Sequence, residues 1–367
     1  MQAVILVGGE GTRLRPLTYG TPKPMVPVFG VPFLERTLSR LKEAGVDDVV
    51  LAAGYLPRAI VEHLGDGSRL GMRLEYVVEK APLGTAGAIR NVAQYLHGPF
   101  FVLNGDVLTS LDLRAMMEYH RRKGGLGCMH LIRVEDPSPF GCVVHDGDGR
   151  IARFVEKPPP GTAETDEINA GTYLLEPAVL DAIPPGRNVS IERETFPNML
   201  AQGAPLYSYT TADYWLDIGR PEQYLQAHFD VLDRRLALGP LADPAAHRGT
   251  FVWGPSDEGK ATGHVVAPSY VGANVTIEPG AELGPYAVLG DGTRVARGAR
   301  IRNAVLWSRV EVGADARIDH AILADDVKIG RSVLVGPGSV IGHAEPIGDY
   351  GVVAPQSRIP AEPASVR

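Results

Sequence analysis

The hydrophobic residues of this chain follow two different periodicities, and the change falls near residue 235. In the first part, short apolar runs at residues 3–7, 49–53 and 100–103 alternate with stretches whose apolar residues lie three or four positions apart. Short apolar runs bounded by glycine or polar residues are typical of buried strands, and the wider spacing is typical of helices. This β-α-β-α-β order predicts an α/β domain with a Rossmann-like, mixed but mostly parallel sheet.

Turn and cap residues place some of these elements more closely. The helix that precedes Gly45 is expected to stop at that glycine. Thr85 is expected to cap the next helix, and Pro221 to open the last helix before the pattern changes. Residues 146–149, Asp-Gly-Asp-Gly, lie between two apolar runs and predict a hairpin.

A six-residue repeat then begins at Val265 and continues to Ile359. Seventeen aliphatic residues stand in register, with 14 gaps of six residues and two of five: Val265, Val271, Ile277, Leu283, Leu289, Val295, Ile301, Leu306, Val312, Ile318, Leu323, Ile329, Val335, Ile341, Ile347, Val353 and Ile359. Three such hexads form one triangular coil whose aliphatic residues stack inside a prism, so the repeat predicts between five and six coils of a left-handed parallel β-helix. A β-sandwich is the alternative, but its strands alternate with a period of two.

These patterns divide the chain into residues 1–235, the α/β domain, residues 236–263, a linker, and residues 264–367, the β-helix. Glycine and proline make up about 20% of the chain, against roughly 12% in average proteins. From the start of the repeat onward, 12 of the 13 glycines fall one or three positions after an aliphatic residue of the repeat. We therefore expect these glycines at the corners of the coils.

Charge and cysteine content exclude several classes of protein. The net charge is −7 and no long basic run occurs, so neither nucleic acid nor an anionic membrane is expected as a partner. There is no run of 18 apolar residues and no signal-peptide pattern at the N-terminus, so no membrane insertion is expected. Cys128 and Cys142 are too few for a disulfide framework and are expected to be small buried hydrophobes, which favours a reducing compartment, the cytoplasm.

A glycine-rich loop follows the first predicted strand, which ends at Leu6 and Val7. The residues of the loop are Gly8, Gly9, Gly11, Thr12 and Arg13. Backbone N–H groups of such a loop approach phosphate oxygens without interference from Cβ atoms. The loop is not a Walker A loop, which needs Gly-Lys-Ser/Thr, and it lacks the third glycine of a dinucleotide fingerprint, where Leu14 stands.

Two charged residues, Lys23 and Asp106, are candidates for binding phosphate and metal. Lys23 lies between Pro22 and Pro24, which restrict the backbone on both sides, and this rigid presentation of an ammonium group suits a phosphate ligand. Asp106 follows a buried strand, at the edge where open α/β sheets bind ligands. A carboxylate there suits Mg²⁺, although Asn-Gly-Asp is also good turn chemistry.

Three further segments place polar residues at strand ends. Glu156 and Lys157 end a hairpin strand, and only one of them can face a ligand unless the backbone bends. Asn169 and Gly171 precede an apolar run and offer an amide and a bare backbone. Asp217 lies among aromatic and aliphatic residues, where an acid is usually paired or metal-bound. A salt bridge, a turn and a helix cap are the respective alternatives.

Three histidines, His264, His320 and His343, lie in or beside the repeat. Many hexapeptide-repeat proteins are acyltransferases with a histidine in a coil. Here no long insertion loop accompanies the repeat, and the three histidines are expected to be solvated corner residues.

Taken together, these segments resemble the sugar-1-phosphate nucleotidyltransferases. The motifs that carry the resemblance are residues 8–18, 22–24, 156–158, 169–171 and 215–219, and the resemblance covers almost the whole chain, including the tail. Within the family, residues 6–9 and 82–87 are most similar to those of enzymes that make GDP-mannose. The resemblance implies that residues 1–235 are catalytic and convert an NTP and a sugar 1-phosphate to an NDP-sugar and pyrophosphate, with GTP and mannose 1-phosphate as the expected substrates.

The resemblance also implies roles for single residues. Arg13, Lys23, Asp106 and Asp217 are expected to be catalytic, and the two aspartates would hold Mg²⁺ between the reacting phosphates. The nucleotide is expected to contact Leu6, Gly8, Gly9, Gly11, Thr12, Arg13, Lys23, Gly84 and Thr85. The sugar phosphate is expected to contact Gly141, Glu156, Lys157, Asn169 and Gly171.

Three other functions remain open at this stage. The enzyme could be a glucose-1-phosphate thymidylyl- or uridylyltransferase, because base choice rests on a few loop contacts. A non-catalytic regulatory subunit that binds a sugar nucleotide would keep the fold but tends to lose motif residues, and a bifunctional enzyme would use its β-helix as an acyltransferase. The β-helix is expected to support a homo-oligomer, since its flat faces and open ends are natural contact surfaces.

Overall fold

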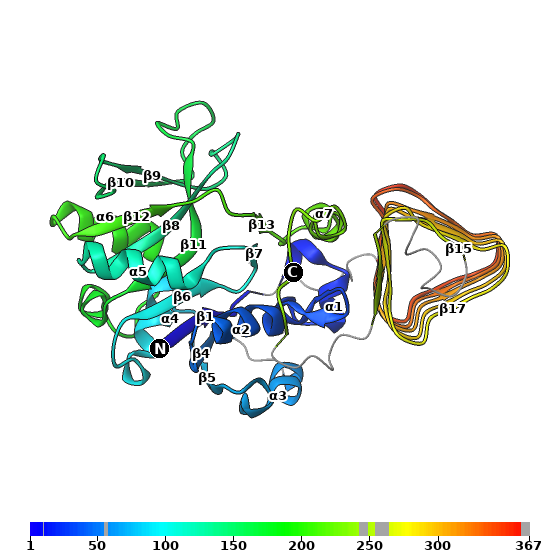
Figure 1. Ribbon diagram of the computed structural model, residues 1–367, viewed down its shortest axis with the longest axis horizontal. Helices are drawn as coiled ribbons and strands as arrows, with labels where there is room; N and C mark the ends of the chain where they lie inside the picture. Colours follow the sequence, from blue (N-terminus) through cyan, green and yellow to red (C-terminus); the bar gives the residue numbers. More distant parts are fainter. Residues whose placement is uncertain (10, 55–57, 242–248, 254–263, 361–367) are drawn as a thin grey trace. The chain divides into compact units, whose positions relative to one another are not determined.

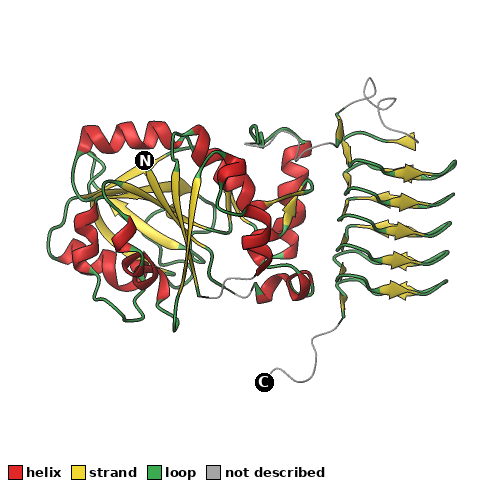
Figure 2. Cartoon of the chain, turned by 90° about the horizontal axis from the view of Figure 1, so that it is seen from below, coloured by secondary structure: helices red, strands yellow, loops and turns green. Residues whose placement is uncertain are grey.

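The computed structural model describes residues 1–9, 11–54, 58–241, 249–253 and 264–360 (Figure 1). Strands and helices alternate along the first part of the chain, and short strands then recur at the spacing of the repeat. Figure 2 shows the two architectures, a twisted sheet with helices on both sides and a stack of regularly spaced coils. The predicted α/β fold and the parallel β-helix after it are both confirmed.

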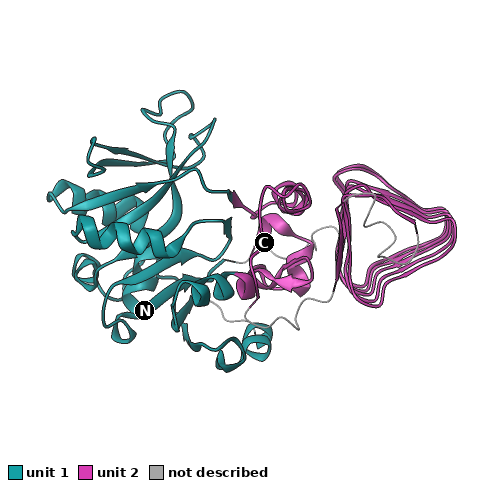
Figure 3. Cartoon of the chain, viewed as in Figure 1, with its two compact units in different colours: residues 1–9, 37–215 teal, residues 10–36, 216–367 magenta. Residues whose placement is uncertain are grey.

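The chain forms two compact units (Figure 3). The first consists of residues 1–9 and 37–215, and the second of residues 10–36 and 216–367. Most of the glycine-rich loop is therefore grouped with the repeat, and the units do not follow the expected boundaries at residues 235 and 263. Those boundaries remain a prediction about domains, and most of the expected linker lies outside the described residues.

The first unit is built on a nine-stranded sheet with the order β10-β9-β11-β6-β1-β4-β5, to which β8 and β12 attach beside β11. Its parallel half contains β6 (Phe100–Asn104), β1 (Gln2–Leu6), β4 (Asp48–Ala53) and β5 (Arg73–Val78). The three runs predicted as buried strands are β1, β4 and β6, and they pair side by side and parallel. The carboxyl ends of β1 and β6 therefore lie at the same edge of the sheet.

The other half of this sheet is mainly antiparallel. Its strands are β8 (Gly127–Arg133), β9 (Gly141–His145), β10 (Ile151–Glu156), β11 (Glu167–Leu175) and β12 (Leu206–Thr210). β9 and β10 form the predicted hairpin. The register between β11 and β8 shifts between Asn169 and Tyr173, so β11 carries a bulge. Two short strands lie outside this sheet: β7 (Val107–Thr109), which comes directly after β6 in the chain, and β13 (Trp215–Asp217), which comes after β12.

Helices connect these strands. They are α2 (Phe33–Glu43), α3 (Arg58–Leu64), α4 (Gly84–Asn91), α5 (Leu113–Lys123) and α6 (Phe196–Ala201), with short turns η3 (Ser68–Leu70), η4 (Ala93–Tyr95) and η5 (Pro177–Ala182) and a π-helical turn, η6 (Ile191–Thr195). Gly45 follows α2 with a φ of 84°, as expected of a stop. The prediction that Thr85 caps α4 is wrong, because the helix already begins at Gly84 and Leu83 occupies the cap position.

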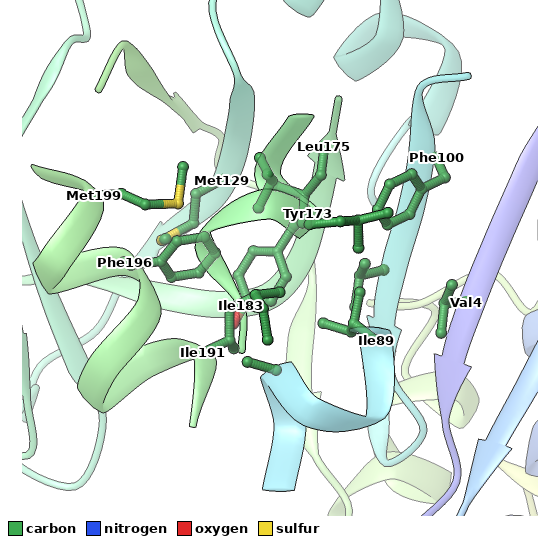
Figure 4. Close-up of a cluster of buried hydrophobic side chains, with 14 of the residues drawn as sticks. Val4, Ile89, Phe100, Met129, Tyr173, Leu175, Ile183, Ile191, Phe196 and Met199 are labelled. Carbon is green, nitrogen blue, oxygen red and sulfur yellow. The ribbon is translucent and has the colours of Figure 1, made fainter. Parts of the chain in front are cut away.

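A cluster of buried side chains packs between the sheet and these helices (Figure 4). Tyr173 of β11 lies at its centre, and its ring meets that of Phe196 edge to face, with centroids 5.1 Å apart. Ile183 and Ile191 lie beside it. Each aliphatic or aromatic side chain buried in this way stabilises the fold by about 1.5–3 kcal/mol.

The second unit contains the β-helix. Its strands are β15 (His264–Val265), β16 (Ser269–Val271), β17 (Thr276–Ile277), β18 (Glu282–Leu283), β19 (Ala287–Leu289), β20 (Arg294–Val295), β21 (Arg300–Arg302), β22 (Ala304–Leu306), β23 (Glu311–Val312), β24 (Arg317–Asp319), β25 (Ile322–Leu323), β26 (Lys328–Ile329), β27 (Leu334–Val335), β28 (Val340–Ile341), β29 (Pro346–Ile347), β30 (Val352–Val353) and β31 (Arg358–Ile359). All seventeen aliphatic positions of the repeat fall in these strands. Every third strand pairs in parallel, which gives the three sheets of a triangular prism.

The corners of the coils use glycine for two separate reasons. The third residue after the inward aliphatic position has a positive φ in nearly every hexad, whether it is a glycine, as Gly292, or another residue, as Asp315. Most glycines one position after the aliphatic residue permit close packing between coils. A Cβ atom on Gly290 would lie 2.6 Å from the backbone carbonyl carbon of Trp307 in the next coil, closer than real Cβ contacts allow.

One outward face of the β-helix is apolar and covered within the second unit. Its buried outward residues include Tyr270, Val288, Val305, Ile322 and Val340. Residues 21–32 and helix α7 (Pro221–Leu232) cover this face together with β14 (Thr250–Val252), which pairs with β16. Residues 10–36 contain η1 (Thr12–Leu14), α1 (Leu17–Gly20), η2 (Lys23–Met25), β2 (Pro27–Val28) and β3 (Val31–Pro32). Helix α7 begins at Pro221, as predicted.

Candidate active site

The candidate site residues are divided between the two units, and each set is described within its own unit. The first unit holds Leu6, Gly8, Gly9, Gly84, Thr85, Asp106, Gly141, Glu156, Lys157, Asn169 and Gly171. The second unit holds Gly11, Thr12, Arg13, Lys23 and Asp217.

The carboxyl ends of β1 and β6 form the first part of the set. Leu6 is in register with Asn104, and the Gly105 N–H donates to the Leu6 carbonyl at 3.0 Å. A Cβ atom at position 105 would lie 2.6 Å from that oxygen, so only glycine permits the two strand ends to approach. Asp106 follows at once and is half-buried. The chain thus turns sharply at the sheet edge and presents a carboxylate there.

Glu156 and Lys157 face the same side at the end of β10. Lys157 has a φ of 50°, in the left-handed region that non-glycine residues rarely adopt. Its N–H donates to the Phe140 carbonyl at 3.0 Å, which fixes this bend. The bend brings Nζ of Lys157 to 3.7 Å from Oε1 of Glu156. The backbone therefore bends at Lys157, which is the condition that the sequence analysis set for both side chains to lie on one side.

Burial raises the pKa of Glu156 above its ordinary value, and the charge of Lys157 opposes this shift. The Glu156 side chain is only 18% exposed. Gly141, opposite it on β9, leaves the space for this carboxylate, because a Cβ atom there would lie 2.7 Å from Oε2. An acid and an ammonium group side by side suit a ligand that carries both hydroxyl groups and an anion.

Asn169 builds the bulge of β11. Its Oδ1 accepts from the Gly171 N–H at 3.0 Å, and its Nδ2 donates to the Tyr173 hydroxyl at 2.7 Å. Gly171 has a φ of 75°, and a Cβ atom on it would lie 2.6 Å from Nδ2 of Asn104. The Asn169 amide thus holds the Gly171 backbone on one side and the Tyr173 side chain on the other, and the bulge lies close to the end of β6.

Gly84 and Thr85 form the first turn of α4 beneath residues 187–189. The Val189 carbonyl accepts from the N–H groups of Ala86 and Gly87 at 3.0 and 3.3 Å. A Cβ atom on Gly84 would lie 2.6 Å from that carbonyl oxygen. The glycines of this segment therefore permit close backbone packing, and two amides of the first turn already have protein acceptors.

Glu192 is a residue that the sequence analysis missed. One of its oxygens, Oε2, accepts from the hydroxyls of Thr85 and Ser190, both at 2.8 Å. Its charge helps to raise the pKa of Glu156 and, together with burial, that of Tyr173. Glu192 lies in the π-helical turn η6, a type of turn often found at functional sites. No motif pointed to it, since only the fold brings residue 192 close to residue 85.

In the second unit, Asp217 and Arg13 approach each other. Oδ1 of Asp217 accepts from the Gly219 N–H at 2.7 Å, and Oδ2 lies 4.0 Å from Nη2 of Arg13. Half of the Arg13 side chain is exposed. A Cβ atom on Gly219 would lie within 2.8 Å of both side chains, so this glycine leaves room for the pair.

Lys23 opens η2 directly after the extended Pro22 and is half-buried. Gly11 packs against it, since a Cβ atom on Gly11 would lie 3.0 Å from Cβ of Lys23. The Thr18 hydroxyl donates to the Gly11 carbonyl at 2.9 Å and closes the loop. Gly11, Arg13 and Lys23 thus belong to one compact loop, and the exposed Thr12 opens its first turn, η1.

Each unit offers a carboxylate of the kind that binds a divalent metal together with substrate oxygens. Among the residues that the structure describes, no three histidine, cysteine or acidic side chains gather into a protein metal cage. Mg²⁺ is commonly held by one or two carboxylates, with phosphate and water oxygens as its other ligands. Asp106 and Asp217, each half-buried at the end of a strand or beside one, offer that kind of ligand.

A Rossmann-like sheet with a glycine loop, two basic side chains in that loop, and acids at strand ends defines an enzyme that handles nucleotide phosphates. Comparison with known families gives the class directly. Residues 2–234 match the model of the nucleotidyl transferase family, and residues 265–362 match that of the GMPPB C-terminal domain. The chain belongs to the nucleotidyl transferase family. Within the described parts of the chain, every helix is too short or too polar to span a membrane.

Several relatives cover most of the chain. A mannose-1-phosphate guanylyltransferase of Mycobacterium tuberculosis is 42% identical over 86% of this chain and 82% of its own length. A UTP–glucose-1-phosphate uridylyltransferase of Synechocystis is 33% identical over 86% of this chain and 85% of its own length. Among solved structures, HddC of Yersinia pseudotuberculosis complexed with GMP-PN is 32% identical, with a TM-score of 0.53, over 62% of this chain and 97% of that one.

Proposed function

We propose that this protein condenses GTP with mannose 1-phosphate to give GDP-mannose and pyrophosphate. The observation that carries the proposal is the similarity to a mannose-1-phosphate guanylyltransferase over 86% of the chain, β-helix included. The family match of the β-helix to a GMPPB C-terminal domain supports the same activity. The solved structure of HddC with GMP-PN supports a guanine nucleotide, since that relative is similar over 62% of this chain.

The residues divide the work of the reaction by charge. Arg13 and Lys23 hold the triphosphate and stabilise the departing pyrophosphate. Lys157 holds the phosphate of the incoming sugar, and Glu156 accepts hydrogen bonds from its hydroxyls. The incoming phosphate is already ionised near neutral pH, so no general base is needed. Catalysis then depends on positioning and on compensation of charge.

Two anions must meet in this reaction, and their repulsion is large. Two unit charges 4 Å apart repel by about 4 kcal/mol at an effective dielectric constant of about 20. We propose that Asp106 and Asp217 hold Mg²⁺, which when bound neutralises phosphate charge and aligns the reacting groups. Enzymes of this family use a divalent metal, and the two carboxylates are suitable ligands for Mg²⁺.

The choice of base and sugar is the finer part of the proposal. A uridylyltransferase acting on glucose 1-phosphate is the second candidate, because the Synechocystis relative of that name is 33% identical over most of the chain. Hexose 1-phosphates differ at single hydroxyls, and a site that hydrogen-bonds one hydroxyl discriminates by orders of magnitude.

The purified protein with Mg²⁺ is tested against four NTPs combined with mannose, glucose and galactose 1-phosphate, and pyrophosphate release is measured. We expect the highest kcat/KM with GTP and mannose 1-phosphate. A preference for UTP or dTTP with glucose 1-phosphate would establish the second candidate instead. Absence of pyrophosphate release with every pair would indicate a non-catalytic, nucleotide-sugar-binding protein.

We also propose that the protein forms homo-oligomers through its β-helix. The last coils carry exposed apolar residues on one outward face, with Leu334 beside Val352 in the sheet and Tyr350 next to them. Exposed apolar side chains at neighbouring positions are typical of contact surfaces. Sedimentation or light scattering of the full chain, compared with the variant Val352→Lys, tests this.

A further inference from the structure

His343 of the β-helix differs from the solvated corner residue that the sequence suggested. It follows β28, and its side chain is only 24% exposed. Its ring meets that of Trp307 edge to face, with centroids 5.3 Å apart. His264, by contrast, is exposed. The prediction of a solvated corner is therefore wrong for His343, because residues 17–21 cover this part of the coil.

Both ring nitrogens of His343 have partners within the second unit. Nε2 lies 3.0 Å from Oγ1 of Thr21 and 3.2 Å from the Leu17 carbonyl oxygen. A carbonyl can only accept, so Nε2 carries a proton in this arrangement and donates toward the loop. Nδ1 lies 3.7 Å from Oδ2 of Asp325, an acid held on the neighbouring coil by the Ser308 N–H at 2.8 Å.

The loop is also shaped to receive this histidine. A Cβ atom on Gly20 would lie 2.7 Å from Cδ2 of His343, so the absence of a side chain at position 20 permits the contact. Gly342 is close to Pro16 in the same way, since a Cβ atom on Gly342 would lie 3.2 Å from Cβ of Pro16. Two glycines, one on each side, thus let the coil and residues 16–21 pack directly together.

A second anchor lies on the other side of Lys23. The indole N–H of Trp307 donates to the Tyr224 hydroxyl at 2.9 Å, and that hydroxyl donates to the Pro27 carbonyl at 2.5 Å. Tyr224 is fully buried. The loop is therefore held at Thr21 and at Pro27, and Lys23 lies between these two points.

We propose that His343 and Trp307 are positioning residues for residues 16–27, the segment that carries Lys23, so that the β-helix fixes the backbone that presents Lys23 to the NTP. The inference rests on the proposed role of Lys23 in nucleotide binding. Neither side chain touches substrate in this scheme. The β-helix is then part of the catalytic apparatus, because a ligand loop fixed before binding loses less conformational entropy when the NTP binds.

The test measures NTP binding and turnover in variants of the full chain. His343→Ala removes the donor, and we expect the KM and the dissociation constant for the NTP to rise about 5- to 20-fold, while the KM for the sugar phosphate changes less than about twofold. His343→Gln places an amide N–H near the position of Nε2, and we expect it to recover most of the loss. His264→Ala is the matched control on the same repeat and should behave as the wild type.

Thr21→Val probes the same contact from the loop and leaves the β-helix intact. If Thr21 and His343 act through each other, the double variant will be no worse than His343→Ala alone. Tyr224→Phe tests the second anchor by the same assays. Equal effects on both substrates, or no recovery in His343→Gln, would indicate general destabilisation and overturn the proposal, as would wild-type kinetics in His343→Ala.

The proposed function and this inference can fail separately. If the wild type releases no pyrophosphate with any substrate pair, the proposed activity fails, and the binding of NTP alone, measured by calorimetry, still tests the loop anchor. If the wild type is active and His343→Ala binds NTP as tightly as the wild type does, the proposed loop anchor is wrong and the proposed activity stands.

Discussion

The ammonium nitrogen of Lys157 lies 3.7 Å from a carboxylate oxygen of Glu156, although the two residues are adjacent in the chain. On a regular strand, neighbouring side chains point to opposite faces. The left-handed backbone of Lys157, with a φ of 50°, removes that alternation. A strained residue at the end of β10 thus puts a carboxylate and an ammonium group on the same side of the strand. Strain of this kind is often found at binding sites.

This geometry gives a first prediction, on the sugar-phosphate contact. Lys157→Asn keeps a residue that tolerates the left-handed conformation and removes the ammonium group. A hydrogen bond to a charged group contributes about 1.5–3 kcal/mol, so we expect kcat/KM for the sugar phosphate to fall about 10- to 100-fold. The KM for the NTP should stay within about twofold in the same steady-state assays.

Two companion variants separate charge from backbone. Lys157→Val adds a β-branched side chain at positive φ, and we expect it to unfold at lower urea concentration than Lys157→Asn, by about 1–2 kcal/mol in free energy. Lys42→Asn removes a partly exposed lysine that pairs with Asp47, and it should change kcat/KM little. A Lys157→Asn enzyme with unaltered kinetics would contradict the assigned contact.

A second prediction concerns Glu156 and pH. Burial raises the pKa of this carboxyl in the folded protein above its unfolded value, so the folded state holds the proton more tightly. Its contribution to stability is therefore greatest at low pH and declines as pH rises through the interval between the two pKa values. We expect Glu156→Gln to gain stability relative to the wild type as pH rises from about 4 to 7, measured by urea denaturation, while the KM for the sugar phosphate increases.

Glu118→Gln is the control for this comparison, because Glu118 is exposed on α5. The KM of Glu118→Gln for the sugar phosphate should stay within about twofold of that of the wild type. A constant difference for Glu156→Gln would show that burial does not penalise its charge.

A third prediction tests the proposed metal ligands. Asp106→Ala and Asp217→Ala should each lower kcat by orders of magnitude at a fixed Mg²⁺ concentration, with the fold intact by circular dichroism. Asp106→Asn and Asp217→Asn should require more Mg²⁺ for half-maximal rate, since a neutral amide is a weaker ligand. Asp112→Ala removes the N-cap of α5 and should cost about 1 kcal/mol of stability without changing the metal requirement. Near-wild-type turnover in both alanine variants would sink the metal assignment.

A fourth prediction uses two glycines with the same backbone angle. Gly84 and Gly186 both have a φ of 68°, but a Cβ atom would meet the Val189 carbonyl at 2.6 Å in the first case and nothing within 4 Å in the second. Gly186→Ala should cost about 1 kcal/mol from its φ alone. Gly84→Ala should cost at least about 1 kcal/mol more, measured as the shift in the urea midpoint. Equal losses of stability in the two variants would mean that the segment around Val189 moves aside at no cost in free energy.

Much of the fold could be predicted because it is set by short-range pattern. The six-residue period of the repeat directs each aliphatic residue into the prism, and all of these positions fall in the strands of the β-helix. Pro221 fixes the start of α7 through its own ring. Thr85 shows the limit of local signals, since long-range packing of Val189 on α4 decides where that helix begins.

The chemistry of the site could be predicted in part. Residue types such as Lys23 between two prolines, or an acid after a buried strand, mark phosphate and metal chemistry wherever they fold. Glu192 could not be found this way, because its contact with Thr85 joins segments more than a hundred residues apart. A signal for the covered face of the β-helix did exist, namely the apolar residues before every third aliphatic position, such as Val288 and Val305.

The sequence by itself determined the two architectures and the residue types of the candidate site, because periodicity and turn chemistry act over a few residues. Only the tertiary structure decided which side chains meet. It bends Lys157 toward Glu156, and it places His343 against Thr21 although they are 322 residues apart in the chain. In both cases the contact depends on another segment of the chain, namely Phe140 for the bend at Lys157 and residues 17–21 for His343, and a local pattern does not encode which segments meet.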